Sequence, residues 1–432
     1  MRVSPTLVAG WIAGGFLLLA LGVPLAAVAL RGLADGPWQT LITVATDPYL
    51  QRTLARTALQ AALSTLLTVA LGLPAALAFA RWSFPGKRLA RAAFTVPFVM
   101  PSVVAGAGFL ALIGPRGVLP WDLTDTLALV LAAHVFYNVA VVIRMVGGFL
   151  ESAAPRLRDA AATLGASPLR TVRRVTLPLA TPMIAASAAL VFVFCFTSFG
   201  VIKIIAPGGG WDTLEVEIYR VLGRLVRLDL AAGLALVQLG VAMIAAGLYT
   251  RLQARTATPL VGATPLPRPG PVGRAVLIAT LAPAALLTAA PLTALLVRAF
   301  AGSGAGASLD GFRAAFAPSA LLGVVSGWDA LANSLRFAAA SGAVATIVGV
   351  AFAYAVVRGG QRWLDRASLL PLATSSVTLG LGVLLAWPAA AGSFWGLALA
   401  HALIGTPFVT RAVLPSLRCV PASRTAAAAV GG

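Results

Sequence analysis

The side chains that could do covalent chemistry are few in this 432-residue chain and stand far apart. The two histidines, His134 and His401, and the hydroxyl of Ser198 all lie in apolar stretches. Nucleophilic catalysis needs such a hydroxyl beside a base, and Ser198 has no evident base. The sequence also has no paired carboxylates, no cluster of metal-ligand residues and no Gly-x-x-x-x-Gly-Lys-Ser/Thr phosphate loop. We therefore expect no catalytic residues, no bound metal and no directly bound cofactor.

Binding chemistry is better represented than catalysis. An aromatic run with two hydroxyls, Phe196-Thr197-Ser198-Phe199, follows Cys195, and Tyr137-Asn138 stand in an earlier apolar stretch. Aromatic faces attract organic cations, so these residues could contact a cationic aromatic solute. Aromatic residues on a membrane helix are also typical of simple packing, and both interpretations stay open.

The polar stretch from Arg156 to Leu179 is the other group of interest. Leu157, Ala160, Ala161 and Leu164 have the spacing of one narrow helix face made mostly of small residues. Gly165 suits a left-handed turn that ends this helix, while Ser167 and Pro168 suit the cap and first turn of a second one. The stretch predicts a helix, a sharp bend and a second helix. The alternative is an ordinary amphipathic loop.

The elements that hold these residues are membrane spans. Hydrophobic residues make up 59% of the chain, charged residues 10%, and the mean hydropathy is +0.93. This composition indicates an all-α polytopic membrane protein. The net charge of +19 is concentrated in short segments between apolar runs, which orients spans in a bilayer and gives no reason to expect nucleic acid.

Apolar runs predict the spans in order. A basic cluster from Arg81 to Arg88 is expected on the cytoplasmic side, as is the 156–179 stretch, and Pro97 and Pro101 are expected to kink or break the third span. Segments 114–126 and 206–222 are expected outside, as is 301–332. The predicted spans cover about 7–30, 53–80, 92–113, 127–149, 183–205, 230–248 and 275–300, and the rest belong to a repeat.

The chain repeats its own pattern after a linker. Leu54 and Thr57 return as Leu331 and Ser334, and Arg81 returns as Arg358, all at one offset; His134 and Arg144 return as His401 and Arg411. Pro155 and Arg158 return as Pro421 and Arg424. We therefore expect two tandem parallel repeats: a first half over 1–251, a linker over 252–273, and a second half over 274–432.

A family resemblance rests on the polar stretch. Asp159-Ala160-Ala161, Gly165 and the Val175-Thr176-Leu177-Pro178 run resemble the Glu-Ala-Ala signature of permease subunits of bacterial ABC importers, with Asp in place of the usual Glu. The resemblance implies a MetI-like permease fold in the bacterial inner membrane. It also implies a cytoplasmic ABC ATPase dimer that hydrolyses the ATP, and a periplasmic or lipid-anchored solute-binding protein. The residues expected to couple to the ATPase are Asp159, Ala160, Ala161, Gly165, Ser167, Val175, Leu177 and Pro178.

The second half carries only part of this signature. Ala426, Ala427 and Gly431 match its beginning, and the sequence stops at Gly432. Measured against the first half, we expect a truncated copy, with about ten spans present of an expected twelve. A truncated chain that is non-functional, or that serves as a scaffolding membrane protein, is therefore an alternative to an active permease.

The cargo is suggested by a second resemblance. Cys195-Phe-Thr-Ser-Phe199 and Thr213-Leu-Glu-Val-Glu-Ile-Tyr219 look like runs in the thiamine permeases, and the iron(III) permeases share a similar second run. Thiamine or a thiamine-like cation is favoured, because the spans nearly lack the oxygen ligands that iron prefers. On this interpretation the translocation path includes Tyr137, Asn138, Phe196, Thr197, Ser198 and Phe199.

Overall fold

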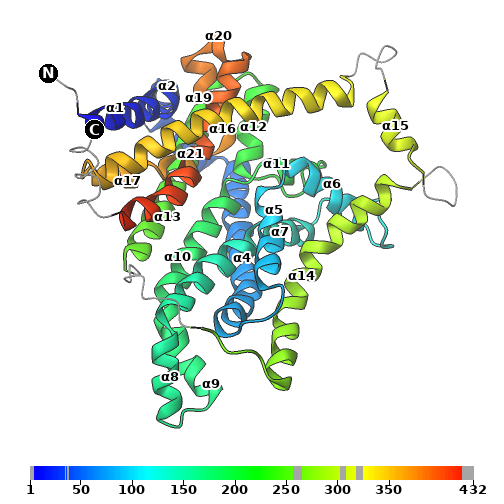
Figure 1. Cartoon of the computed structure of the whole chain (residues 1–432). Coiled ribbons are helices and arrows are strands. Elements are labelled where there is room, and N and C mark those ends of the chain that lie inside the picture. The colour runs from blue at the N-terminus through cyan, green and yellow to red at the C-terminus, as the bar shows by residue number, and fades with distance from the viewer. Residues whose placement is uncertain are drawn as a thin grey trace. The chain divides into compact units, whose positions relative to one another are not determined.

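The computed structural model describes residues 4–34, 36, 38–255, 265–301, 308–317 and 325–420, and the regular elements in these ranges are helices (Figure 1). Part of the expected linker, 256–264, lies outside the described residues, as do Ala426, Ala427 and Gly431. The chain forms two compact units. Unit 1 takes its residues from Met1–Val44, Ile218–Leu239 and Asp310–Gly432, and unit 2 from Ala45–Glu217 and Gly240–Leu309.

The predicted membrane spans are present as helices. Among the described residues, eight helices are long and apolar enough to cross a bilayer, and two bent helix pairs raise the number to ten, as expected. The eight are Pro5–Gly32 (α1 Pro5–Leu17, η1 Leu18–Gly22, α2 Val23–Gly32), α4 Pro48–Arg81, α7 Leu127–Ala153, Pro168–Phe196 (α9 Pro168–Thr171, η2 Val172–Thr176, α10 Leu177–Phe196), α13 Leu228–Ala254, α14 Pro271–Ala299, α16 Gly327–Val357 and α21 Phe394–Cys419.

Both bent pairs break at a capping residue. Helices α5 (Lys87–Val99) and α6 (Ser102–Ile113) meet at 102°, with Pro101 at the N-cap of α6, so the third span is broken as Pro97 and Pro101 predicted. The second pair joins Trp363–Ala373 (α17 Arg362–Ala367, α18 Leu370–Ala373) to α19 (Ser376–Ala386) at 100°, and Ser375 caps α19. The remaining short helices are α3 Gln39–Thr46, α8 Pro155–Thr163, α11 Gly200–Ile205, α12 Leu214–Gly223, α15 Asp310–Phe316 and α20 Pro388–Ala391.

Helix α7 forms the centre of unit 2 and packs against α4, α5 and α10. It is the most buried of the eight long spans, since 72% of the residues in its 18-residue apolar stretch are buried. The contact with α4 is close: a Cβ on Gly72 would lie 2.8 Å from the Cβ of Val142. A small residue is required there because the two helix backbones approach each other.

Unit 1 contains the same kind of helix pair. Helix α16 packs against α21, and a Cβ on Gly349 would lie 2.6 Å from the Cβ of Val409. Each unit therefore has a long helix with a crowded glycine, a span broken by about a right angle, and a second long helix. The two units do not follow the two predicted halves, because unit 1 also includes Met1–Val44 and Ile218–Leu239. The internal repeat stays a prediction.

The fifth span differs from the sequence prediction. It was expected over 183–205, but the helix runs from Pro168 to Phe196, and Thr197–Phe199 separate it from α11. Hydropathy did not predict the first part of this helix, because many of its first residues are polar. The π-helical turn η2 precedes Pro178, and η1 likewise precedes Pro24. A wider turn relieves the clash of a proline ring with the carbonyl four residues earlier.

Candidate functional site

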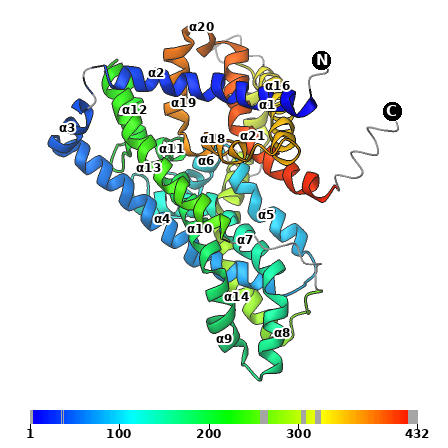
Figure 2. The ribbon, with the colours of Figure 1, turned by 90° about the vertical axis from the view of Figure 1, so that its left-hand side faces the viewer.

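The polar stretch of the sequence folds into a helical hairpin, α8–α9, at one end of unit 2 (Figures 1 and 2). Gly165 has φ +74°, its N–H donates to Ala162 O at 2.9 Å, and Ala166 N–H donates to Ala161 O at 2.9 Å. This pair of bonds is the Schellman ending of a helix. Ser167 Oγ accepts from Arg170 N–H at 3.4 Å, and Pro168 occupies the first turn of α9. The predicted helix, bend and second helix are confirmed.

The hairpin exposes apolar and small side chains at its tip. Leu164 is 87% exposed and Leu169 is 68% exposed, one on each side of the bend. Exposed leucines beside small residues mark a surface that another molecule can cover. Of the residues predicted to couple, the exposed ones are Asp159, Ala160, Gly165, Ser167 and Pro178, and the half-buried ones are Ala161, Val175 and Leu177.

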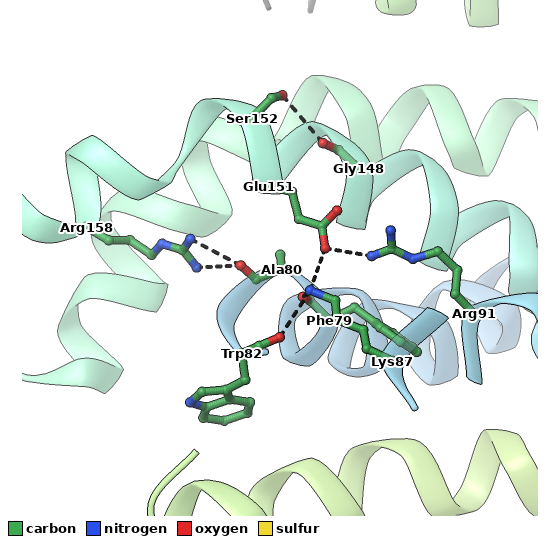
Figure 3. Close-up of polar contacts among 9 residues, drawn as sticks. All are labelled: Phe79, Ala80, Trp82, Lys87, Arg91, Gly148, Glu151, Ser152 and Arg158. Atoms are coloured by element: carbon green, nitrogen blue, oxygen red, sulfur yellow. Dashed lines mark hydrogen bonds and ion pairs between the residues drawn. The ribbon is translucent and has the colours of Figure 1, made fainter. Parts of the chain in front are cut away.

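Arg158 ties the hairpin to the end of α4. Both terminal nitrogens of its guanidinium donate to Ala80 O at 3.1 Å (Figure 3). Burial and the nearby Arg81 lower the pKa of Arg158 from its ordinary value, but an arginine keeps its charge at neutral pH. A cation at this place also suits the negative end of the α4 dipole.

Lys87 and Glu151 extend the same attachment to two more helices. Lys87 Nζ, in α5, donates to Phe79 O at 2.6 Å and to Trp82 O at 3.1 Å. Glu151, in α7, pairs with Lys87 at 2.8 Å and with Arg91 at 2.6 Å (Figure 3). We call Lys87, Arg91, Glu151, Arg158 and the carbonyls of Phe79, Ala80 and Trp82 the anchor. It joins α8 to α4, α5 and α7.

The anchor was not found from the sequence. The basic residues at 81–88 were interpreted only as a topological signal, and Arg158 only as a repeat landmark. One signal was available: Glu151 is the only carboxylate between Asp125 and Asp159. A single acid next to several bases at a span end predicts a specific ion pair, but the chain alone does not show which bases it meets.

The opposite end of unit 2 gathers segments predicted to be external. Asp125 Oδ1 accepts from Gly208 N–H at 2.8 Å, and Thr57 Oγ1 accepts from Leu214 N–H at 2.8 Å. Tyr49 Oη donates to Glu217 at 2.8 Å. Residues predicted for one side of the membrane therefore meet at one end of the unit, and the basic segments meet at the other.

The structure divides the residues predicted for the translocation path. Asn138 is 4% exposed and donates to His134 O at 2.9 Å, and Phe196 is 1% exposed and stacks on Phe192. Tyr137 and Phe199 are half-buried and pack with another hydrophobic group around α6 and α11. Thr197 and Ser198 are half-buried in the break after α10. Asn138 and Phe196 thus contribute to helix packing, and the path itself stays a prediction.

A buried serine–histidine pair was also missed. Ser64 Oγ lies 2.9 Å from His134 Nδ1, joining α4 to α7. A nucleophile needs access to substrate, but Ser64 is fully buried and His134 is 2% exposed. This contact is therefore a hydrogen bond between spans. Gln60 adds a second polar link, donating to Cys195 O at 2.9 Å.

The chain is similar to inner-membrane transport proteins. Residues 68–258 match the family described as binding-protein-dependent transport system inner membrane component. The sulfate transport system permease protein CysT of Salmonella typhimurium (strain LT2) is 30% identical over 256 residues, which are 57% of this chain and 92% of that protein. The thiamine transport system permease protein ThiP of Escherichia coli (strain K12) is 31% identical over 245 residues, which are 54% of this chain and only 46% of that protein.

Solved structures give a weaker likeness. A bacterial ABC transporter involved in the import of the acidic polysaccharide alginate aligns over 58% of this chain and 94% of that one. The TM-score is 0.47 and the sequence identity is 16%.

Proposed function

Because this chain belongs to the family of binding-protein-dependent transport system inner membrane components, we propose that it moves a small organic cation, thiamine or a close analogue, from an external binding protein to the cytoplasm. Members of the family are the permease subunits of ABC importers in the inner membrane, and the ATPase is a separate subunit. The finer proposal concerns the cargo, the coupling residues and the two partners.

The α8–α9 hairpin carries the proposal for the ATPase contact. It offers exposed Leu164 and Leu169, small residues at Ala160 and Ala161, and a carboxylate at Asp159. The small residues let another protein approach closely, and Asp159 can pair with a basic group. The anchor then passes any movement of α8 to α4, α5 and α7.

The second arm of the hairpin gives a direct route into the membrane. Helix α9 continues through η2 into α10, so an ATPase that moves α9 also moves the fifth span. Transport needs no chemistry in this chain. It needs ATP-driven closure to favour the arrangement that opens toward the other side of the membrane, because only a difference in binding between two states can shift their equilibrium.

Charge at the outer end supports a cationic cargo. Glu215 is fully buried there, Glu217 is 5% exposed, and both belong to the segment that resembles the thiamine permeases. Buried carboxylates favour cations over oxyanions in their surroundings. Sulfate is the second candidate, since the similarity to a sulfate permease covers 92% of that protein. Iron(III) is a third candidate, because the run from Thr213 to Tyr219 is similar to one in the iron(III) permeases.

Substitutions in the bend test the coupling role. Gly165→Pro should abolish ATPase activity that depends on the binding protein, because proline cannot adopt a φ of +74°. Gly165→Asn is the matched control, since asparagine tolerates the left-handed region and a Cβ there meets nothing within 4 Å. Ala161→Trp should also uncouple by blocking close approach. Normal coupling in Gly165→Pro and Ala161→Trp, with both proteins inserted, would contradict the assignment.

The cargo is tested by reconstitution. The full chain, its ATPase and its binding protein are placed in proteoliposomes, and uptake of labelled thiamine, sulfate and iron(III) is compared. Thiamine uptake that requires ATP and the binding protein is expected. Uptake of sulfate or iron alone would overturn the cargo proposal and leave the coupling assignment intact. No uptake of any solute by a folded, membrane-inserted chain would support the non-functional or scaffolding alternative.

A further inference from the structure

A basic cavity beside the anchor is not explained by coupling. It has a volume of about 730 Å³ and lies between α5, α7 and the segment at Pro265 and Leu266. Four cations line it, Lys87, Arg88, Arg91 and Arg144, against one carboxylate, Glu151. The cavity is therefore left with a formal excess of positive charge.

Two of the four cations have no partner among the described residues. Glu151 pairs with Lys87 and Arg91. Arg88 and Arg144 are exposed, and no ion pair or hydrogen bond of either side chain is found within the described parts of the chain. In addition, Arg91 Nε is buried without an acceptor among those residues. The cavity therefore contains positively charged hydrogen-bond donors that have no acceptor among the described residues.

The cavity extends from the end of the spans into them. Arg144 lies seven residues before Glu151 on α7, which places it about 10 Å farther into the span at 1.5 Å per residue. Thr95, another lining residue, lies about 12 Å beyond Lys87 along α5. An arginine at such a depth is costly unless it meets an anion or water. A ligand that fills the cavity must combine an anionic group with a body that tolerates lipid.

We propose that this cavity binds the phosphate group of an anionic phospholipid from the leaflet at the basic end of unit 2. Arg88 and Arg144 would hold the phosphate oxygens, since guanidinium forks match phosphate geometry. Basic pockets between spans on the cytoplasmic side are a known way of holding anionic headgroups. Free phosphate has the same oxygen chemistry, so the experiment must separate the two sources.

The test is lipid binding by the purified full chain, measured by native mass spectrometry with phosphatidylglycerol and phosphatidylcholine as probes. Phosphatidylglycerol should bind preferentially. Each of Arg88→Gln and Arg144→Gln should weaken it about fivefold, and both together about thirtyfold. The matched control is Arg251→Gln with Arg255→Gln, two exposed arginines at the end of α13, which should change binding less than twofold. Glu151→Gln should strengthen binding, because it removes the only carboxylate lining the cavity.

Two outcomes would overturn the site: equal binding of phosphatidylcholine, or unchanged phosphatidylglycerol binding in the double arginine variant. Competition with inorganic phosphate then identifies the source. Retention of phosphatidylglycerol in millimolar phosphate supports the lipid, whereas its displacement overturns the lipid and assigns the cavity to a soluble phosphate. None of these results depends on which solute is transported.

Discussion

At the scale of single residues, the molecule depends on polar contacts that a motif does not mark. Asp159, Ala160 and Ala161 match the family signature, yet the side chain that fastens their helix to a span is Arg158. Asp159 and Ala160 are exposed and Ala161 is half-buried, so a partner can reach this face of the helix. Their neighbour is turned inward, toward Ala80. The motif marks the exposed face of the helix. It does not mark Arg158, the residue that attaches the helix to α4.

Replacing Arg158 should uncouple the hairpin. Arg158→Gln loses the charge and the paired donors at Ala80 O, so ATPase stimulation by the binding protein should fall about tenfold while the protein still assembles. Arg158→Lys keeps the charge and one donor and should retain more stimulation than Arg158→Gln. The measurement is ATP hydrolysis by the complex in nanodiscs. Equal stimulation in wild type and Arg158→Gln would show that the contact transmits nothing.

The Ser64–His134 contact should contribute to stability. Ser64→Ala leaves His134 Nδ1 without its partner inside the α4–α7 interface, which should lower the free energy of unfolding by about 1 kcal/mol. Thr65→Ala is the control, because the Thr65 hydroxyl donates to Ala61 O within its own helix and makes no bond between spans among the described residues. Chemical unfolding in detergent measures both. A loss for Thr65→Ala as large as that for Ser64→Ala would indicate a helix effect.

At the scale of elements, prolines stand both at a break in a span and inside continuous spans. Pro101 stands at a break of 102°, whereas Pro178 and Pro24 follow π-helical turns and leave the helix continuous. The sequence indicated that prolines would disturb the spans, and it identified the broken third span correctly. It did not show that the Leu-Pro end of the signature lies inside a helix, because a π turn leaves no mark in hydropathy.

Replacing Pro178 should change the rotation of α9 about the helix axis relative to α10. In Pro178→Ala the clash that favours the wider turn is gone, and a regular α-helix would rotate α9 by about 100° relative to α10. We expect folded protein at normal levels with coupled ATPase activity reduced at least tenfold. Pro182→Ala, one turn later in α10, is the control, because no π turn precedes it. Coupling as strong as wild type in Pro178→Ala would show that η2 has another cause.

At the scale of the whole molecule, hydropathy was the most informative sequence feature. Hydropathy located most spans, and the repeated landmarks predicted a second set of helices similar to the first. The crowded glycines Gly72 and Gly349 occupy equivalent places in the two sets, each against a valine. The anchor and the basic cavity could not be predicted in this way, because they bring together groups from α4, α5, α7 and α8 that have no common spacing in the sequence.

The equivalent glycines should respond alike. Gly72→Ala and Gly349→Ala each place a Cβ within 3 Å of a valine Cβ, so each should lower the free energy of unfolding by about 1–3 kcal/mol. Gly148→Ala in α7 and Gly342→Ala in α16 are controls, because a Cβ at either position meets no atom within 4 Å. Both should be neutral or stabilising. Thermal unfolding in detergent compares the four variants. Loss at one glycine and none at the other would mean that the two helix pairs are not packed alike.

Because helix α9 continues without interruption into α10, a small rotation of the hairpin would displace the far end of α10 by a larger distance. Helix α10 has 20 residues, a stiff rod of about 30 Å, and η2 stands at its base where a pivot would stand. A swing of about 10° at that pivot would carry the far end of the rod through about 5 Å, a distance comparable to the width of an aromatic ring. A small displacement of the hairpin tip would therefore become a larger displacement at the far end of α10.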